Sequence, residues 1–214
     1  MNPNQINFDD YTLNVMKKNF KILITLVLLF IESNTFGQEY QFDILNTSLK
    51  EYILLEKELG SEIIQSNSNH ISFTGEAQPI KFKRTQKIIP NLVTYLYFQK
   101  KDSTMSKVLY EWDIKNDNKS GEKQSNKFIK KLIKQHKKLE KLLTKLYGKP
   151  EGFGNLSEIE KVDKNGGLKR NCKWYPNDRT TIELYIVTSN YTEKRGIISI
   201  KPTHRIRLYI RKVN

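Results

Sequence analysis

Two stretches of the sequence carry positive charge in a pattern that suits the binding of an anion. In the segment 122–147 the apolar residues fall on one side of a helical wheel and nine lysines fall on the other. In the segment 205–211 arginine alternates with apolar residues, so a strand would turn its arginines to one face. The residues expected to contact an anionic ligand are Lys130, Lys134, Lys137, Lys138 and Lys141 in the first stretch and Arg205, Arg207 and Arg211 in the second.

The simplest interpretation of the lysine-rich segment is a helix that packs on a core and turns its lysines to water. Only Glu122 and Glu140 oppose the nine lysines, however, whereas solvent-exposed helix faces usually mix charges of both signs. Repulsion between lysines one turn apart costs roughly 0.2–0.5 kcal/mol for each pair, and a bound anion would relieve it. The sequence leaves open whether the lysines and the arginines form one surface.

The charge of the whole chain points the same way. Its 214 residues include 37 basic and 23 acidic residues, which give a formal net charge of +14. Residues 38–114 contain nine basic and ten acidic residues, whereas residues 115–214 contain 25 basic and ten acidic residues. A codon bias toward lysine would act on both halves, so it does not explain the split. The favoured partners are anionic lipid, lipopolysaccharide or acidic glycan, and nucleic acid is disfavoured because no nucleic-acid-binding motif is present.

The residue types that carry catalysis or bind metals form no recognisable motif. His70, His136 and His204 are scattered without H-x-x-x-H spacing, and the position of His136 within the apolar arc of 122–147 is typical of a core or boundary histidine whose hydrogen bonds are satisfied. Cys172 is the only cysteine, which excludes an intrachain disulfide and a cluster of several thiolates, and we expect it to be buried. No catalytic residue, metal site or cofactor is therefore predicted, and a small secreted hydrolase is the least favoured function.

A protein-binding or inhibitor-like module is the alternative to anion binding. Its contacts would be aromatic residues of the sheet such as Tyr95, Tyr97 and Tyr209. Trp112 and Trp174 each end a strand-like segment, and packing between sheet and helix is the simpler interpretation of both. The sequence does not decide the oligomeric state.

The N-terminal region has the pattern of a secretion signal. The basic stretch 16–21 precedes the apolar segment 22–31, which is too short to span a bilayer. Thr35 and Gly37 are the small residues expected before a cleavage site at Gln38. This pattern resembles the secretory signals of flavobacterial exported proteins. We expect residues 1–15 to precede the translation start, residues 16–37 to be a signal peptide, and the mature chain to be periplasmic or extracellular without a transmembrane helix.

Helices and strands are expected to position these residues as follows. Apolar residues recur at helical spacing in 43–59 and 122–147. Strand-like segments lie at 70–74, 80–84, 92–98 and 107–114, and again at 158–162, 168–175, 181–187, 196–200 and 205–213, with a hairpin turn at 163–167. We therefore predict an α+β fold with antiparallel sheet and two helices, as one domain over 38–214 with halves 38–114 and 115–214. Two tandem α-β-β-β units are one arrangement that fits this order.

Overall fold

Each of the two α-helices in the described part of the chain begins directly after a serine that caps it. The computed structural model describes residues 39–65 and 75–213, in which α2 covers Leu49–Glu58 and α3 covers Asn126–Tyr147. The hydroxyl oxygens of Ser48 and Ser125 accept hydrogen bonds from the backbone N–H groups of the first turns. Both helices are therefore shorter at the N-terminus than the predicted segments 43–59 and 122–147. The predicted signal peptide and the predicted strand 70–74 lie outside the described residues.

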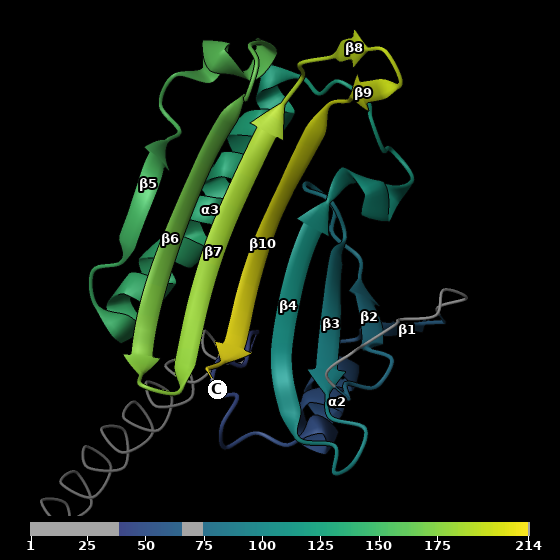
Figure 1. Ribbon diagram of the computed structural model, residues 1–214, viewed down its shortest axis with the longest axis vertical. Helices are drawn as coiled ribbons and strands as arrows, with labels where there is room; N and C mark the ends of the chain where they lie inside the picture. The colour runs from purple at the N-terminus through teal and green to yellow at the C-terminus, as the bar shows by residue number, and fades with distance from the viewer. Residues whose placement is uncertain (1–38, 66–74, 214) are drawn as a thin grey trace, which may run out of the picture. The chain divides into compact units, whose positions relative to one another are not determined.

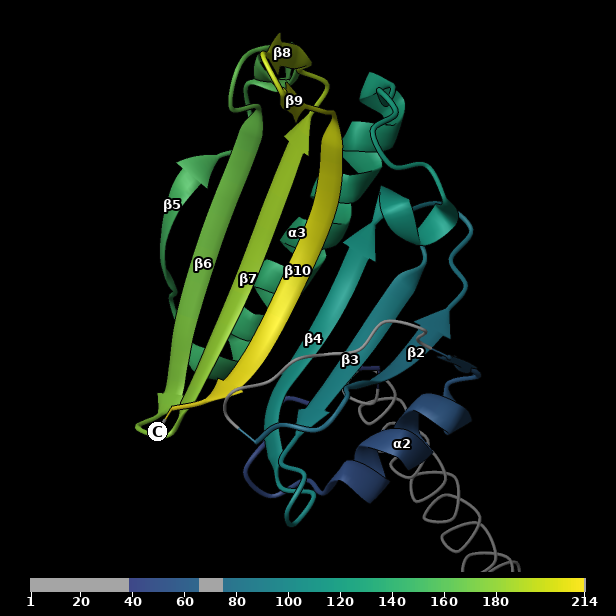
Figure 2. The same ribbon diagram turned by 45° about the vertical axis from the view of Figure 1, so that its right-hand side comes forward.

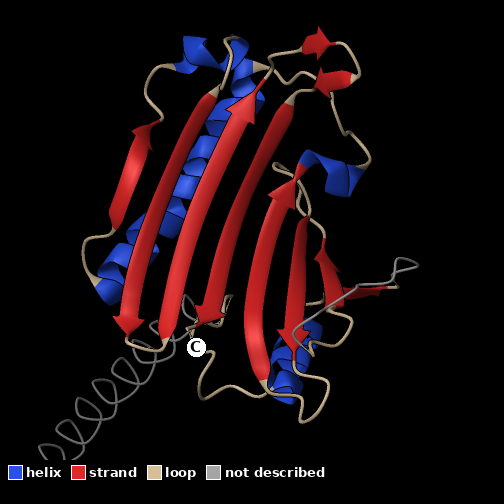
Figure 3. Ribbon diagram, in the orientation of Figure 1, coloured by secondary structure: helices blue, strands red, loops and turns tan. Residues whose placement is uncertain are grey.

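Eight strands form one antiparallel sheet in the order β1-β2-β3-β4-β10-β7-β6-β5 (Figure 1). The strands are β1 (Glu62–Ile64), β2 (Ile80–Arg84), β3 (Leu92–Phe98), β4 (Met105–Asp113), β5 (Glu151–Asn155), β6 (Leu168–Asn177), β7 (Thr180–Ser189) and β10 (Thr203–Lys212). A separate hairpin of β8 (Glu193–Arg195) and β9 (Ile198–Ile200) connects β7 to β10, and two short 3-10 helices cover Ile114–Asp117 (η1) and Ile159–Asp163 (η2) (Figure 3). The predicted α+β class is confirmed.

Each helix precedes four strands that lie next to one another in the sheet. Strands β1 to β4 follow α2, and β5, β6, β7 and β10 follow α3. The last strands of the two sets, β4 and β10, pair antiparallel at the centre of the sheet, from Asp113 opposite Arg205 to Lys107 opposite Arg211. Each predicted unit of a helix and three strands is therefore extended by one strand in the large sheet.

The extra strands, β1 and β5, lie at the two edges of the sheet (Figure 1). All five residues of β5 are exposed, so the strand lacks the alternation by which a half-buried strand is recognised. At Gly154 a Cβ atom would lie 2.1 Å from the carbonyl oxygen of Lys169, so a residue without a Cβ is needed for this pairing. The predicted strand 158–162 is wrong, because this segment forms η2, and 163–167 is therefore not a hairpin turn between two strands.

Both helices cover the same face of the sheet (Figures 1 and 2). The hydroxyl of Thr94 in β3 donates a hydrogen bond to Glu56 of α2, and the ring of Phe128 in α3 packs edge-on against His204 of β10. Directly paired residues share one face, and the pairs Thr94–Tyr110 and Tyr110–Leu208 carry this face from β3 to β10. The core lies between this face and the helices, and its buried residues include Trp112, Trp174 and Cys172, as predicted.

No helix within 39–65 and 75–213 is both long enough and apolar enough to cross a membrane.

Candidate functional site

The lysines of α3 lie on the side of the helix that faces away from the sheet. Buried residues such as Ile129, Leu132 and Leu143 form the opposite side, which packs on β6, β7 and β10. The prediction that the apolar residues lie on one side of the helix and the lysines on the other is confirmed, except that Leu146 is exposed. All five predicted helix residues, Lys130, Lys134, Lys137, Lys138 and Lys141, are exposed, and so are Lys127, Lys131 and Lys145. The amphipathic sequence thus presents eight lysines on one helix face.

The only acidic residue within α3 does not neutralise these lysines. The carboxylate of Glu140 accepts hydrogen bonds from the guanidinium of Arg170 in β6, the shortest of them 2.5 Å long. Glu122, the second acidic residue of the predicted segment, precedes the helix. Among the described residues, Lys130, Lys134 and Lys141 have no ion pair. The positive charge of this face is therefore largely unopposed.

One edge of the lysine face forms a groove with the connection between β2 and β3. The groove, of about 670 Å³, is lined by Thr85, Gln86, Lys87, Ile88, Ile89, Lys131, Lys134, Gln135 and Lys138, and we call it the lysine groove. Four of the nine lining residues are lysines, and none of the nine is an aspartate or a glutamate. Ile88 is 60% exposed and supplies apolar surface beside the ammonium groups. A concave site of this size with apolar and cationic walls suits an anionic amphiphile.

The predicted arginines lie on the other face of the sheet. Ile206, Leu208 and Ile210 of β10 are fully buried on the face that the helices cover, so the alternate residues Arg205, Arg207, Tyr209 and Arg211 point away from the helices. We call this side the outer sheet face. The lysines of α3 and the arginines of β10 are separated by the sheet itself. The two predicted groups therefore do not form one surface.

Two of the three arginines are paired with carboxylates. Arg207 donates to Glu111 at 2.6 Å, and Arg211 donates to Glu183 at 2.7 Å. Arg205 has no such partner among the described residues, and its buried Nε atom makes no hydrogen bond. A patch in which two of three cations are already neutralised is a weaker anion site than the lysine groove.

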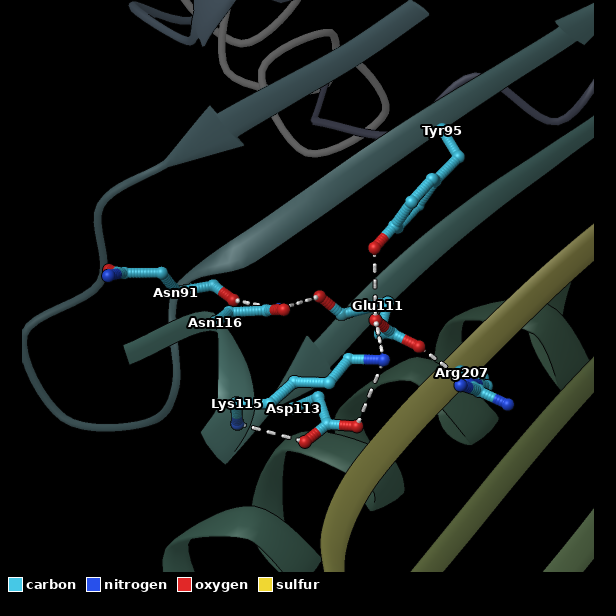
Figure 4. Close-up of polar contacts among 7 residues, drawn as sticks. All are labelled: Asn91, Tyr95, Glu111, Asp113, Lys115, Asn116 and Arg207. Carbon is cyan, nitrogen blue, oxygen red and sulfur yellow. Dashed lines mark hydrogen bonds and ion pairs between the residues drawn. The ribbon is translucent and has the colours of Figure 1, made fainter. Parts of the chain in front are cut away.

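Glu111 is the centre of a polar cluster on the outer sheet face (Figure 4). Its side chain is 1% exposed, and its carboxylate contacts Arg207, the ammonium of Lys115 at 3.2 Å and the hydroxyl of Tyr95 at 3.3 Å. Burial and the charge of Glu111 raise the pKa of Tyr95, so the hydroxyl stays protonated and donates. Asn116 adds a hydrogen bond to the backbone carbonyl of Glu111. The cluster ties β3, β4 and β10 together and has no feature that requires a ligand.

Replacement of Glu111 by alanine should destabilise the fold by about 2–3 kcal/mol, because it removes a buried carboxylate to which Arg207, Lys115 and Tyr95 donate. The value stays below the range for fully buried pairs because Arg207 and Lys115 keep part of their solvent contact. Urea unfolding measures it. A double-mutant cycle with Arg207→Ala should give a coupling of at least about 1 kcal/mol. Additive effects of the two substitutions would contradict the pairing.

The tyrosines of the alternative prediction share the outer sheet face. Tyr95 and Tyr97 stack with ring centroids 6.4 Å apart. The ammonium of Lys107 lies 3.7 Å from the centre of the Tyr97 ring, and the guanidinium of Arg211 lies 4.0 Å from that of Tyr209. The ammonium of Lys81 lies 5.6 Å from the centre of the Tyr95 ring, so a cation–π contact helps to hold each of the three rings in position.

A second polar cluster lies in the core, where α3 packs on β6. His136 and Glu140 are one turn apart on α3, and Arg170 and Cys172 are two residues apart on β6. Burial is the main cause of the pKa shifts of His136 and Cys172. It lowers the pKa of His136 to about 4 and raises the pKa of Cys172 to about 11. Burial also acts on Glu140, but Arg170 outweighs it and lowers the pKa of that carboxyl group. The thiol is therefore protonated, which is the opposite of what a nucleophilic cysteine requires.

The sequence analysis did not predict that these four side chains lie together. The prediction that His136 and Cys172 are buried is confirmed, but neither ring nitrogen of His136 has a hydrogen-bond partner among the described residues. A signal was present in the spacing: a histidine and a glutamate four residues apart on a helix lie on one face. The sequence could not show that this face meets Cys172, because the contact joins residues 36 positions apart.

The chain matches no protein-family model, no curated protein and no solved structure.

Proposed function

We propose that the protein is an exported, non-catalytic binding module whose lysine groove engages the phosphate groups of anionic lipid. The observation that carries the proposal is the composition of the groove, in which four lysines surround an exposed isoleucine without any carboxylate. The excess of 15 positive charges in residues 115–214 supports it, because a field of one sign attracts an anionic surface. The signal-like pattern of residues 16–37 supports an exported protein that meets the lipids of a cell envelope.

The physical basis is electrostatic attraction supplemented by apolar burial. Each basic residue near an anionic membrane contributes about 1 kcal/mol to binding. Lys131, Lys134 and Lys138 follow one another along the same side of α3, and Lys87 faces them from the connection between β2 and β3. Insertion of Ile88 among acyl chains would add hydrophobic stabilisation that a soluble anion cannot supply. Lipopolysaccharide offers the same phosphate groups together with acyl chains, whereas an acidic glycan offers charge alone.

The test compares binding of the proposed mature chain, residues 38–214, to neutral phosphatidylcholine vesicles and to vesicles that also contain phosphatidylglycerol. We expect binding only to the anionic vesicles, and we expect it to fall between about 50 and 300 mM salt as the surface charges are screened. The triple variant Lys131→Glu, Lys134→Glu and Lys138→Glu should weaken binding at least about a hundredfold, from about 1 kcal/mol for each lysine. Co-sedimentation measures both effects.

A matched variant tests whether position matters or only net charge. Lys100, Lys101 and Lys164 are exposed and lie outside the groove. Their triple replacement by glutamate changes the net charge by the same amount and should alter binding by less than about tenfold. An Ile88→Ser variant should lose vesicle binding but keep its affinity for inorganic polyphosphate. Equal losses in both triple variants would refute a site at the groove, and no vesicle binding at the lowest salt would refute the proposal.

The protein-binding module remains the second candidate because Tyr95, Tyr97 and Tyr209 lie together on the outer sheet face, held by cation–π contacts and a stacked pair. Tyrosine and arginine are enriched in protein interfaces. This candidate differs from lipid binding in its salt dependence, which would be small, and in its insensitivity to the groove lysines. It is the function to pursue if the vesicles do not bind.

A further inference from the structure

Four polar side chains meet between α3 and β6, where His136 and Cys172 are buried and Glu140 and Arg170 lie at the edge of the core. His136 and Glu140 belong to α3, and Arg170 and Cys172 belong to the face of β6 on which α3 packs. One ring nitrogen of His136, one carboxylate oxygen of Glu140 and the Sγ atom of Cys172 all lie within 4.8 Å of one another. We propose that these three side chains form a binding site for a divalent transition-metal ion, with Zn²⁺ as the ion that the donor set fits best.

The unpaired ring nitrogens of the buried His136 are the observation that points to a bound ligand. The side chain is fully buried, and neither Nδ1 nor Nε2 forms a hydrogen bond with any described residue. Oε2 of Glu140 lies 3.7 Å from Nδ1 of His136, which is too far for a hydrogen bond. Buried polar groups are nearly always satisfied, because removal from water is otherwise uncompensated. A metal ion would satisfy one of these nitrogens.

Arg170 binds both oxygens of Glu140, and the oxygen with the single hydrogen bond, Oε2, is the one assigned to the metal. Oε1 accepts two hydrogen bonds from Arg170, at 2.5 and 3.2 Å, whereas Oε2 accepts one, at 3.1 Å, and lies 3.7 Å from Nδ1 of His136. Arg170 also donates to the backbone carbonyl of Gly154, which fixes its guanidinium. An outer group that holds a ligand carboxylate in place is a usual part of metal sites. Arg170 is therefore assigned as a positioning residue and not as a ligand.

The chemistry of the three donors selects the class of ion. Sulfur, imidazole nitrogen and carboxylate oxygen together match Zn²⁺, which accepts all three and adopts tetrahedral geometry. On binding, the thiol of Cys172 would lose its proton to water and form the metal–sulfur bond as a thiolate. The thiolate and the carboxylate then carry two negative charges against the two of the ion and the one of Arg170, so the site keeps a net charge of +1. The fourth position would be taken by water, as in sites with three protein ligands.

An ion can reach this site from solvent. The side chains of Glu140 and Arg170 are 21% and 29% exposed. They line a shallow pocket together with Lys137, Asn155, Leu156 and Ser157. Glu140 thus connects the pocket to the buried sulfur and imidazole. The site lies away from the lysine groove, whose lining residues it does not share, so it is independent of the proposed lipid function.

The experiment is a titration of the full chain, reduced with a phosphine and freed of metals with a chelator, with Co²⁺ as the probe. We expect one Co²⁺ per chain, a thiolate-to-cobalt charge-transfer band, and the intense visible bands of tetrahedral cobalt. Because Cys172 is the only cysteine, the charge-transfer band reports this residue alone. Binding at pH 7.5 should release about one proton per ion, from the thiol. Zn²⁺ should displace Co²⁺ and raise the unfolding temperature.

Variants connect the spectrum to the three ligands. Cys172→Ser and His136→Leu should abolish the tetrahedral spectrum or weaken Co²⁺ binding at least tenfold. Glu140→Gln should weaken it, and Glu183→Gln is its matched control, since Glu183 is a half-buried carboxylate that pairs with an arginine on the other face of the sheet. His204→Asn is the control for the loss of a buried histidine. Absence of the charge-transfer band in the unmodified protein would overturn the proposal. An unchanged cobalt spectrum in the His136→Leu variant would overturn it as well.

Discussion

Acidification from pH 7 to pH 4.5 should remove about 2 kcal/mol of folding free energy through His204 alone. The ring of His204 is fully buried, and its only described polar contact is the hydroxyl of Thr188, 2.6 Å from Nδ1. The ring also packs against Phe128 in a T-shaped contact. Burial lowers the pKa of His204 to about 4 in the folded protein, whereas the unfolded value is about 6.5. The neutral ring is therefore favoured only when the chain is folded.

The direction of the effect follows from which state binds the proton. Between about pH 6.5 and pH 4 the unfolded chain takes up a proton that the folded chain does not, so stability falls as the pH falls through this range. Below about pH 4 both states are protonated and the loss from this residue levels off. His136, whose pKa is also lowered to about 4, adds a loss of the same sign.

Urea unfolding at pH 7 and pH 4.5, with a chelator present, measures the loss. The His204→Asn variant keeps a side-chain acceptor near Thr188 but does not titrate in this range, so it should lose about 2 kcal/mol less than the unmodified protein between the two pH values. If both proteins lose the same free energy, His204 is not held neutral by the fold. Carboxylates with lowered pKa values affect both proteins alike and cancel in the comparison.

Replacement of Glu56 by alanine should destabilise the fold by about 3–5 kcal/mol, the range for loss of one partner of a buried ion pair. Glu56 of α2 is 2% exposed and pairs with Arg84 of β2, whose side chain is 11% exposed, at 3.1 Å. The same carboxylate accepts hydrogen bonds from the hydroxyls of Thr94 and Ser61. Its removal takes away the carboxylate that neutralises the guanidinium of Arg84 and accepts from the two hydroxyls.

Two further variants separate the ion pair from other consequences of the substitution. Glu58→Ala makes the same change at an exposed position of the same helix and should alter stability by less than about 0.5 kcal/mol. Replacement of both Glu56 and Arg84 by apolar residues of similar volume should recover most of the loss, since no buried charge then lacks a partner. Chemical unfolding of the three variants measures these differences. A loss below about 1 kcal/mol in Glu56→Ala would show that the pair is not buried in solution.

The two helices are joined to the sheet by the same kind of contact. Glu56 of α2 pairs with Arg84 of β2, and Glu140 of α3 pairs with Arg170 of β6. In each case the strand is the second of the four that follow the helix in the chain. The two contacts differ in exposure, because Glu56 is closed off from solvent while Glu140 opens to a pocket. Only the second pair lies beside a histidine and a cysteine, which is the basis of the proposed metal site.

The sequence by itself determined the features that depend on residues close together in the chain. Strands β2 and β3 were predicted with their observed bounds, 80–84 and 92–98, and alternation along β10 placed Ile206, Leu208 and Ile210 in the core. The separation of lysines from apolar residues on α3 was predicted for the same reason, since helical periodicity is a local property. The edge strands were missed because they contain few buried residues from which a pattern could be recognised.

Only the tertiary structure decided which of these faces meet. The pairing of β4 with β10 brought Glu111 to Arg207, 96 residues away, and so neutralised an arginine that the sequence offered as an anion site. The approach of residues 85–89 to α3 formed the lysine groove, and the packing of α3 on β6 brought His136 to Cys172. Periodicity shows which face of an element is apolar, but the strand order and register that place one face against another depend on contacts between distant residues, which no local pattern encodes.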